Sequence, residues 1–300
     1  MKPIEVISSL PQWAKASPEE ILASPAWAMP CRLGEAQCTM RLDETRPAET
    51  LDLSVALDGE EHVVGIADSE AFPDLHAVWA SRAEVPEQVL LAIVEKDCGP
   101  LLQLIENAVR RQLKISGLAA APAAPDSRLL CARVEGGDAQ RISFTLTLSP
   151  SVENALGQLR CIDPAHPSVR ETRLAAETEY ASFVLPSGDL ASLSPGDALL
   201  LPEIGSISPR LVIEGLFVVS EGGVARWNDD GILRVCAAEP SAIDAGALLD
   251  AASGEKPLTA AQPQENAQLK LVRSGAILAR GHLGRIGSQS AFLVESAANG

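Results

Sequence analysis

Aromatic residues are scarce in this sequence, where Phe, Trp and Tyr together make up only 3% of the chain. The hydrophobic fraction is nonetheless 46%, so the cores must be built mainly from Leu, Val, Ile and Ala. Positive charge is also in short supply, because 24 Lys and Arg stand against 40 Asp and Glu and leave a formal charge of −16. Binding to nucleic acid or to an anionic membrane surface requires clustered Lys and Arg. We therefore expect no nucleic-acid partner.

Long apolar runs and clustered metal ligands are missing as well. No segment approaches the roughly 18 apolar residues that span a bilayer, and residues 1–20 lack the apolar core of a signal peptide. The six cysteines are scattered without a CxxC pair, and none of the four histidines stands near them at zinc-ligand spacing. The sequence thus predicts a cytoplasmic protein with reduced thiols, no direct membrane insertion, no metal site and no cofactor.

The periodicity of apolar residues changes along the chain. Residues 51–64 alternate as a β-hairpin does, whereas residues 86–113 have helical spacing with a break at Gly99–Pro100. Two prolines in the segment 162–171 indicate a domain boundary, and the sequence beyond it is rich in strand patterns. These patterns predict the α+β class, with an amino-terminal α+β domain over residues 1–165 and smaller β-rich modules after it.

Segments of the carboxy-terminal half align with one another. Residues 190–200 match residues 248–258, with Gly196 on Gly254, and residues 222–235 match residues 281–294 after a shift of one residue. Such a degenerate repeat predicts two related units. A unit of about 60 residues buries little surface alone, so we expect the two to pack as a pair and to join their strands.

A family resemblance rests on three stretches: "LASLSPGDALLL" (190–201), "GGVARWNDDGILRV" (222–235) and "LVRSGAILARGHLGRIGSQSAFLVE" (271–295). These are similar to the surface-presentation-of-antigens (SPOA) modules of the SctQ/YscQ/HrcQ family, the C-ring or sorting-platform proteins of bacterial type III secretion. That family is related to the flagellar switch proteins FliM and FliN. The resemblance implies a first SPOA-like module at 166–236 and a second, degenerate one at 237–300.

The same resemblance implies a function in protein transport and virulence. Members of the family are non-enzymatic cytoplasmic scaffolds, peripheral to the bacterial inner membrane when assembled. They link a membrane-side sorting-platform adaptor to the stator protein of the secretion ATPase. Self-association is also implied, or association with a short carboxy-terminal SPOA product from an internal start. Because no Met follows Met40, such a product would need a different start codon.

The expected partner-binding residues are apolar and belong to the carboxy-terminal strands. Burial of apolar strand surface inside a polar rim is the binding mode that the composition favours. The same side chains are also candidates for the core, and the sequence does not separate the two uses. The residues are Leu211, Ile213, Leu216, Val218, Leu271, Ile277, Leu278, Phe292 and Val294.

Two alternatives belong to other functional classes. The first is a CheC-like phosphatase or a chemotaxis-type regulatory enzyme, because Ser149, Glu153 and Asn154 partly match the helix of those relatives of the flagellar switch. Gly157 stands where a second Asn belongs, and an N-cap Ser followed by surface residues is the simpler interpretation. We therefore predict no catalytic residues. The second alternative is a stand-alone binding protein without a secretion context.

Overall fold

The computed structural model describes residues 1–43, 45–67, 72–119, 128–136, 141–201, 209–229 and 231–298. The chain forms two compact units. We call Lys15–Asp163 the middle unit, and Met1–Ala14 together with Pro164–Gly300 the terminal unit. Residues 1–14 thus differ from the expected domain over 1–165, because helix α1 (Pro3–Ser9) packs on helix α10 (Ala245–Ser253).

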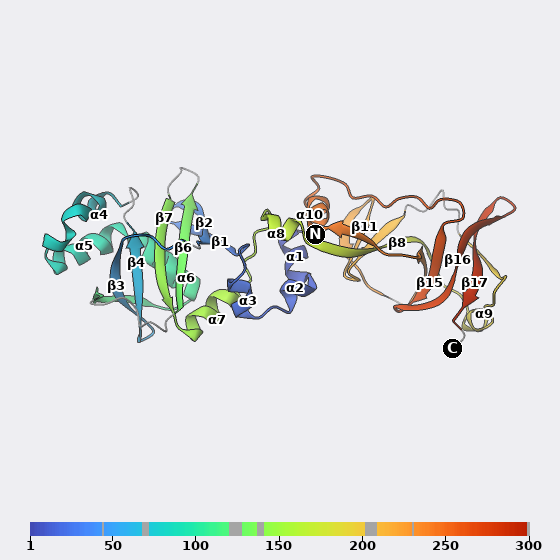
Figure 1. Ribbon diagram of the computed structural model, residues 1–300, viewed down its shortest axis with the longest axis horizontal. Helices are drawn as coiled ribbons and strands as arrows, with labels where there is room; N and C mark the ends of the chain where they lie inside the picture. Colours follow the sequence, from blue (N-terminus) through green and yellow to red (C-terminus); the bar gives the residue numbers. More distant parts are fainter. Residues whose placement is uncertain are drawn as a thin grey trace. The chain divides into compact units, whose positions relative to one another are not determined.

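The middle unit is built on an antiparallel sheet, to which seven strands within the described residues belong (Figure 1). Its strand order is β1-β2-β6-β7-β4-β3-β5. Alternate residues of β3 point into the core, where Leu53 and Val55 are fully buried. The strands are β1 (Ala28–Leu33), β2 (Ala36–Leu42), β3 (Thr50–Leu57), β4 (Glu60–Ala67), β5 (Leu113–Leu118), β6 (Arg128–Gly136) and β7 (Arg141–Leu148).

The hairpin expected over residues 51–64 is confirmed. Leu57 pairs with Glu60 at its end, and Gly59 takes a φ of 88° in the turn. The alternation of apolar and polar residues and the turn at Asp58–Gly59 predict both strands. Strand β3 begins one residue before the predicted segment, at Thr50, and β4 continues three residues beyond it, to Ala67.

The helices of the middle unit include the pair expected over residues 86–113. Helix α5 (Glu87–Asp97) ends just before Gly99, and α6 (Gly99–Val109) begins with Pro100 in its first turn, where a proline costs no hydrogen bond. Leu101, Leu104 and Ile105 are buried on α6. The other helices are α3 (Pro18–Leu22), α4 (Pro73–Val78), the 3₁₀ helix η1 (Trp79–Glu84) and α7 (Pro150–Gln158).

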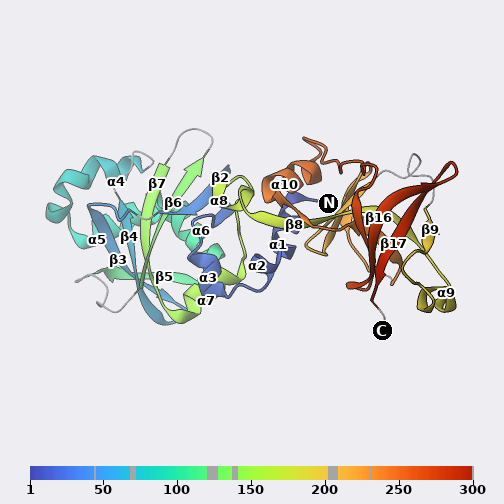
Figure 2. The ribbon, with the colours of Figure 1, turned by 45° about the vertical axis from the view of Figure 1, so that its right-hand side comes forward.

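Helices α3 and α7 lie against each other, as both ribbon views show (Figure 2). Ser17 caps α3 by accepting a hydrogen bond from the backbone N–H of Glu20 at 3.2 Å, and the Glu20 carboxylate accepts one from the Ser17 N–H at 2.7 Å. On α7, a Cβ at Gly157 would lie 2.2 Å from the carbonyl oxygen of Pro18. Only glycine permits this close approach.

The terminal unit has one sheet, to which ten strands within the described residues belong. Its main order is β12-β11-β10-β8-β13-β15-β16-β17-β9, and β14 also pairs with β8. Strands of the predicted segments 166–236 and 237–300 are neighbours at three places, β13 with β15, β17 with β9 and β14 with β8. The strands are β8 (Arg173–Phe183), β9 (Ala198–Leu200), β10 (Arg210–Ile213), β11 (Phe217–Ser220), β12 (Gly223–Arg226), β13 (Leu233–Ala237), β14 (Ser241–Asp244), β15 (Gln268–Arg273), β16 (Ala276–Ile286) and β17 (Gln289–Ala297).

One hydrophobic core is shared by both predicted modules. It includes Tyr180, Leu201, Leu233 and Val235 from the first, and Leu269, Leu271, Leu283, Phe292 and Val294 from the second. The helices of this unit are α1, α2 (Pro11–Ala14), α8 (Pro167–Arg170), α9 (Ser187–Ala191) and α10. The identification of the two segments as SPOA modules stays a prediction.

The aligned repeat segments occupy different places in this sheet. Within residues 281–294, β16 and β17 pair with each other. Within residues 222–235, β12 pairs with β11, whereas β13 pairs with β8 and β15. Alternating apolar residues and turn glycines recur in many antiparallel strands, so their spacing predicts strands without predicting which strand is the neighbour.

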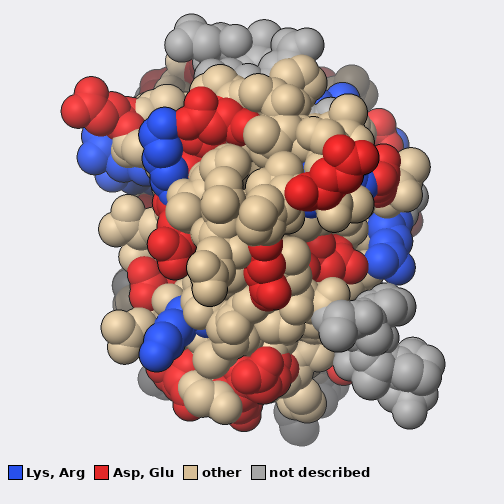
Figure 3. Space-filling model, turned by 90° about the vertical axis from the view of Figure 1, so that its left-hand side faces the viewer, with Lys and Arg blue, Asp and Glu red and all other residues tan. Residues whose placement is uncertain are grey.

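The charge is distributed without a basic patch on the face of the middle unit that carries α4 and α5. Figure 3 shows Asp and Glu spread over this face, with Lys and Arg standing beside them rather than gathered together. In the part of the chain that the structure describes, no helix has both the length and the apolar character needed to cross a membrane.

Candidate partner-binding surface

Most of the predicted partner-binding residues lie inside the terminal unit. Five of the nine have at most 5% of their surface exposed, and they contribute to the core instead of the surface: Leu211, Ile213, Leu271, Phe292 and Val294. Leu216, Val218 and Leu278 are half-buried. Ile277 alone among the nine predicted residues is exposed, at 37%.

An apolar surface does exist on the opposite side of these strands. In the register of the sheet, Leu200 on β9 faces Ala291 on β17, which in turn faces Gly284 on β16. Phe292 points into the core, so its neighbour Ala291 lies on the opposite side of the sheet, because side chains alternate along a strand, although Ala291 itself is fully buried. Leu200 is 53% exposed on this side.

Leu293 and Ile286 extend this surface. Ile286, two residues beyond Gly284 on β16, is 48% exposed. A Cβ at Gly284 would lie 2.3 Å from Cδ1 of Leu293, so the Leu293 side chain lies across β16 where Gly284 has none. We call the set of Leu200, Gly284, Ile286 and Leu293 the outer apolar face; Ala291 lies on the same side of the sheet but is fully buried.

A polar pair borders the outer apolar face. His282 on β16 faces Leu293 in the register, and its Nδ1 lies 2.7 Å from Oε1 of Glu295 on β17. Both side chains are partly exposed, at 29% and 48%. An apolar centre with a charged or polar edge is the arrangement typical of reversible protein–protein interfaces.

Sequence reasoning missed this face for an identifiable reason. The most apolar residues of a strand usually point into the core, so a choice based on apolar character selects Phe292 and Val294. The alternation itself would have placed Leu293 on the other side. No local signal places Leu200 there, because its partner Ala291 lies far along the chain.

A second group of side chains lies around β13, in the middle of the strand order. Arg234 on β13 is 5% exposed, and its guanidinium carbon lies 4.9 Å from the ring centre of Trp227. Val184 is 81% exposed just beyond β8, and Ile232 is 37% exposed just before β13. Trp227 is only half-buried, and this arginine covers its ring.

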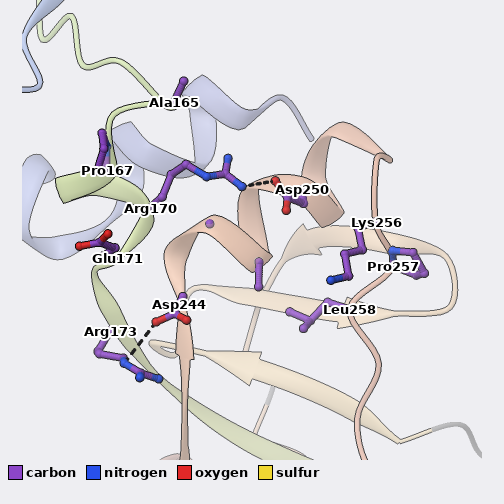
Figure 4. Close-up of a pocket in the computed structure, with 12 residues that line it drawn as sticks. Ala165, Pro167, Arg170, Glu171, Arg173, Asp244, Asp250, Lys256, Pro257 and Leu258 are labelled. Atoms are coloured by element: carbon purple, nitrogen blue, oxygen red, sulfur yellow. Dashed lines mark hydrogen bonds and ion pairs between the residues drawn. The ribbon is translucent and has the colours of Figure 1, made fainter.

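Helices α8 and α10 border a hollow of about 730 Å³ (Figure 4). Arg170 reaches Asp250 across it at 2.6 Å, and Arg173 lies 3.2 Å from Asp244. Lys256, from the segment after α10, lines the same hollow. Basic and acidic side chains alternate here and pair with each other, so the hollow favours no ligand of one charge.

The three residues that suggested a phosphatase, Ser149, Glu153 and Asn154, have structural roles or lie on the surface. Ser149 caps α7 and accepts a hydrogen bond from the Val152 N–H at 3.4 Å. The Glu153 carboxylate is paired with Arg128, while Asn154 is exposed. The close contact of Gly157 with Pro18 leaves no room for an Asn side chain at that position.

Comparison with known proteins does not identify a family for this chain. No family model and no curated protein matches the chain. Among solved structures, the chain is similar to the FliM middle domain from H. pylori, with 14% sequence identity and a TM-score of 0.25. The match covers 52% of this chain and 91% of that one. At such a TM-score we draw no conclusion from the likeness.

Proposed function

We propose that this chain is a non-enzymatic scaffold protein that binds partners through its terminal unit. The observation that supports the proposal best is the outer apolar face, where Leu200 and Ile286 are about half exposed beside Leu293. The sequence resemblance to SctQ-type C-ring proteins, carried by residues 190–201, 222–235 and 271–295, points to the same function.

The physical basis of binding is burial of this apolar surface. Leu200 and Ile286 each expose enough apolar area to gain about 1 kcal/mol or more when a partner covers them. The hydrogen-bonded pair of His282 and Glu295 at the border then sets orientation more than affinity. The acidic charge of the chain, −16, favours a partner that presents basic side chains around an apolar segment.

In its finer form the proposal names the partners. The stator protein of a type III secretion ATPase would bind the outer apolar face, and a membrane-side adaptor would bind elsewhere on the chain. Self-association, or a short carboxy-terminal SPOA product, would compete with the stator for strand surface. The protein would then act at the cytoplasmic side of the bacterial inner membrane.

The test is titration calorimetry of the full chain with the stator protein encoded in the same gene neighbourhood. Two variants, Leu200→Ser and Ile286→Ser, remove apolar area from exposed positions and should each weaken binding roughly tenfold. The matched control is Val89→Ser, because Val89 is 50% exposed on α5 of the middle unit. Circular dichroism checks that all three variants are folded.

The outcomes separate clearly. Weaker binding by the two terminal-unit variants, with the control unchanged, would support both the scaffold function and the docking surface. Equal binding by all variants would remove the outer apolar face from the proposal. A folded full chain that does not bind the stator at all would remove the secretion function.

A further inference from the structure

Two cysteines face each other at the edge of the middle unit's sheet. In the antiparallel pairing of β1 with β2, Cys31 is directly opposite Cys38. Residues at opposite positions point to the same face, with Cα atoms about 4.5–5.5 Å apart. A disulfide requires a Cα separation of about 4.4–6.8 Å. The backbone therefore already has the geometry that an S–S bond needs.

The pair is open to small molecules. Strand β1 is at the edge of the sheet, and a hollow of about 680 Å³ is lined by both cysteines together with Gln37, Glu135 and Gly136. Gly136 faces Cys38 on the other side, and a Cβ there would lie 3.1 Å from the Cys38 sulfur. A side chain at position 136 would therefore crowd the Cys38 sulfur. Cys31 is half-buried and Cys38 is 9% exposed.

The remaining cysteines have no such neighbour among the residues to which the structure assigns a strand partner. Cys131 on β6 faces Thr145, and Cys236 on β13 faces Glu179 and Lys270. Cys98 is fully buried at the junction of α5 and α6. The cross-strand arrangement therefore sets Cys31 and Cys38 apart from these three.

We propose that Cys31 and Cys38 form a dithiol site that a hydroperoxide converts reversibly into an intramolecular disulfide. The Cys31 sulfur attacks the O–O bond, takes one oxygen as a sulfenic acid, and the other oxygen leaves with a proton as water or an alcohol. The Cys38 thiol then attacks the sulfenic sulfur, the S–S bond forms, and water leaves. Two thiols thus give two electrons to one peroxide bond.

The oxidised site changes the surface locally. The disulfide closes a short loop around the β1–β2 turn, so its entropic effect on the unfolded chain is small. It removes two polar S–H groups from the hollow and fixes the edge strand to its neighbour. Burial and the neighbouring Cys38 raise the pKa of the Cys31 thiol to about 11, so the first step is slow at neutral pH and only sustained oxidant exposure completes it.

Peptide mapping tests the proposal, because trypsin cleaves after Arg32 and so separates the two cysteines. The reduced full chain is treated with hydrogen peroxide, its free thiols are alkylated, and the protein is digested without reductant. We expect the peptides 16–32 and 33–41 to be joined by a bond that dithiothreitol breaks. The same treatment of Cys161→Ser, the control, should give the same joined peptides.

A second variant tests the order of the steps. In Cys38→Ser, the sulfenic acid on Cys31 has no thiol to attack it, so dimedone should label Cys31 and the peptides should stay separate. Peroxide treatment of the folded wild type that leaves both peptides unlinked, or that links either cysteine to another one, would overturn the proposal. Linkage in the unfolded chain but not in the folded chain would overturn it as well.

Discussion

Nε2 of the buried His62 lies 3.7 Å from Oε2 of Glu60, at the start of strand β4. The same carboxylate oxygen accepts hydrogen bonds from the hydroxyls of Ser151 at 2.9 Å and Ser149 at 3.2 Å. Both serines belong to the amino end of α7, where the helix dipole favours a negative charge. Glu60 therefore connects the β3–β4 hairpin to this helix.

The first prediction concerns acid stability. The serine hydroxyls, Ser151 most strongly, lower the pKa of Glu60 below its ordinary value, with smaller contributions from Arg111 and His62. Because the pKa is lower in the folded than in the unfolded state, Glu60 stabilises the fold at neutral pH. This contribution is lost as the pH falls through the lowered pKa of the folded state.

Glu60→Gln should consequently unfold at a lower urea concentration than wild type at pH 7, and the difference should shrink on acidification. The neighbouring Glu61→Gln is the control, since Glu61 is exposed. A difference between Glu60→Gln and wild type that does not shrink between pH 7 and acid pH would show that the charge of Glu60 does not contribute to stability.

The second prediction concerns the contact of α3 with α7. Gly157→Ala places a methyl group 2.2 Å from the Pro18 carbonyl oxygen, so the helices must separate at a cost of about 1–3 kcal/mol in the free energy of unfolding. Gly99→Ala is the matched control, because nothing lies within 4 Å of the new Cβ. Chemical denaturation measures both, and equal stability of the two variants would contradict the close contact.

The third prediction concerns a charged pair on β8 and β15. Lys270 is 6% exposed, and its Nζ lies 2.6 Å from Oε1 of Glu177. Glu177→Gln leaves a buried ammonium group without its counter-charge and should lower the free energy of unfolding by about 3 kcal/mol. The double variant Glu177→Gln with Lys270→Met should recover part of this loss.

An exposed ion pair provides the control for that cycle. Arg173 and Asp244 are 70% and 52% exposed, so Arg173→Gln should change stability by at most about 1 kcal/mol. Thermal and urea unfolding report both effects. If Glu177→Gln were no more destabilising than Arg173→Gln, the buried pair of Lys270 and Glu177 would contribute no more to the free energy of unfolding than an exposed ion pair.

The fourth prediction concerns the pH dependence of the rate at which the Cys31–Cys38 disulfide forms. Since the pKa of Cys31 is raised to about 11, its thiolate fraction grows roughly tenfold for each unit of pH between 7 and 9. The rate at which hydrogen peroxide joins the two peptides should grow in the same proportion. A rate that levels off near pH 8.5, as expected for an ordinary thiol, would contradict this and place the first attack on a different cysteine.

Local features of the fold could be predicted because local sequence determines them. The cap at Ser17, the turn at Asp58–Gly59 and the helix break at Gly99–Pro100 each depend on residues within one turn of each other. The packing of α1 on α10 could not be predicted, because amphipathic spacing shows that Val6 and Ile7 are buried without showing which element covers them.

The candidate surface was less predictable for the same reason. Apolar character identified Phe292 and Val294 correctly as important to the strands, but not which side of the sheet they face. Leu200 became part of a surface only through its pairing with Ala291, and these residues are 91 positions apart (291 minus 200). Pairing over such a distance is decided by the whole sheet, not by the segment.

The pairing of β9 with β17 also determines when the terminal unit can complete its folding during synthesis. Strand β9 is synthesised early, but the edge it closes belongs to β17, the last strand of the sheet to emerge. Until then, residues 198–200 have no strand to join, and the long sequence separation makes the closing step slow. Proteolysis of stalled nascent chains should therefore find the β9 region open until β17 has emerged, and protected afterwards.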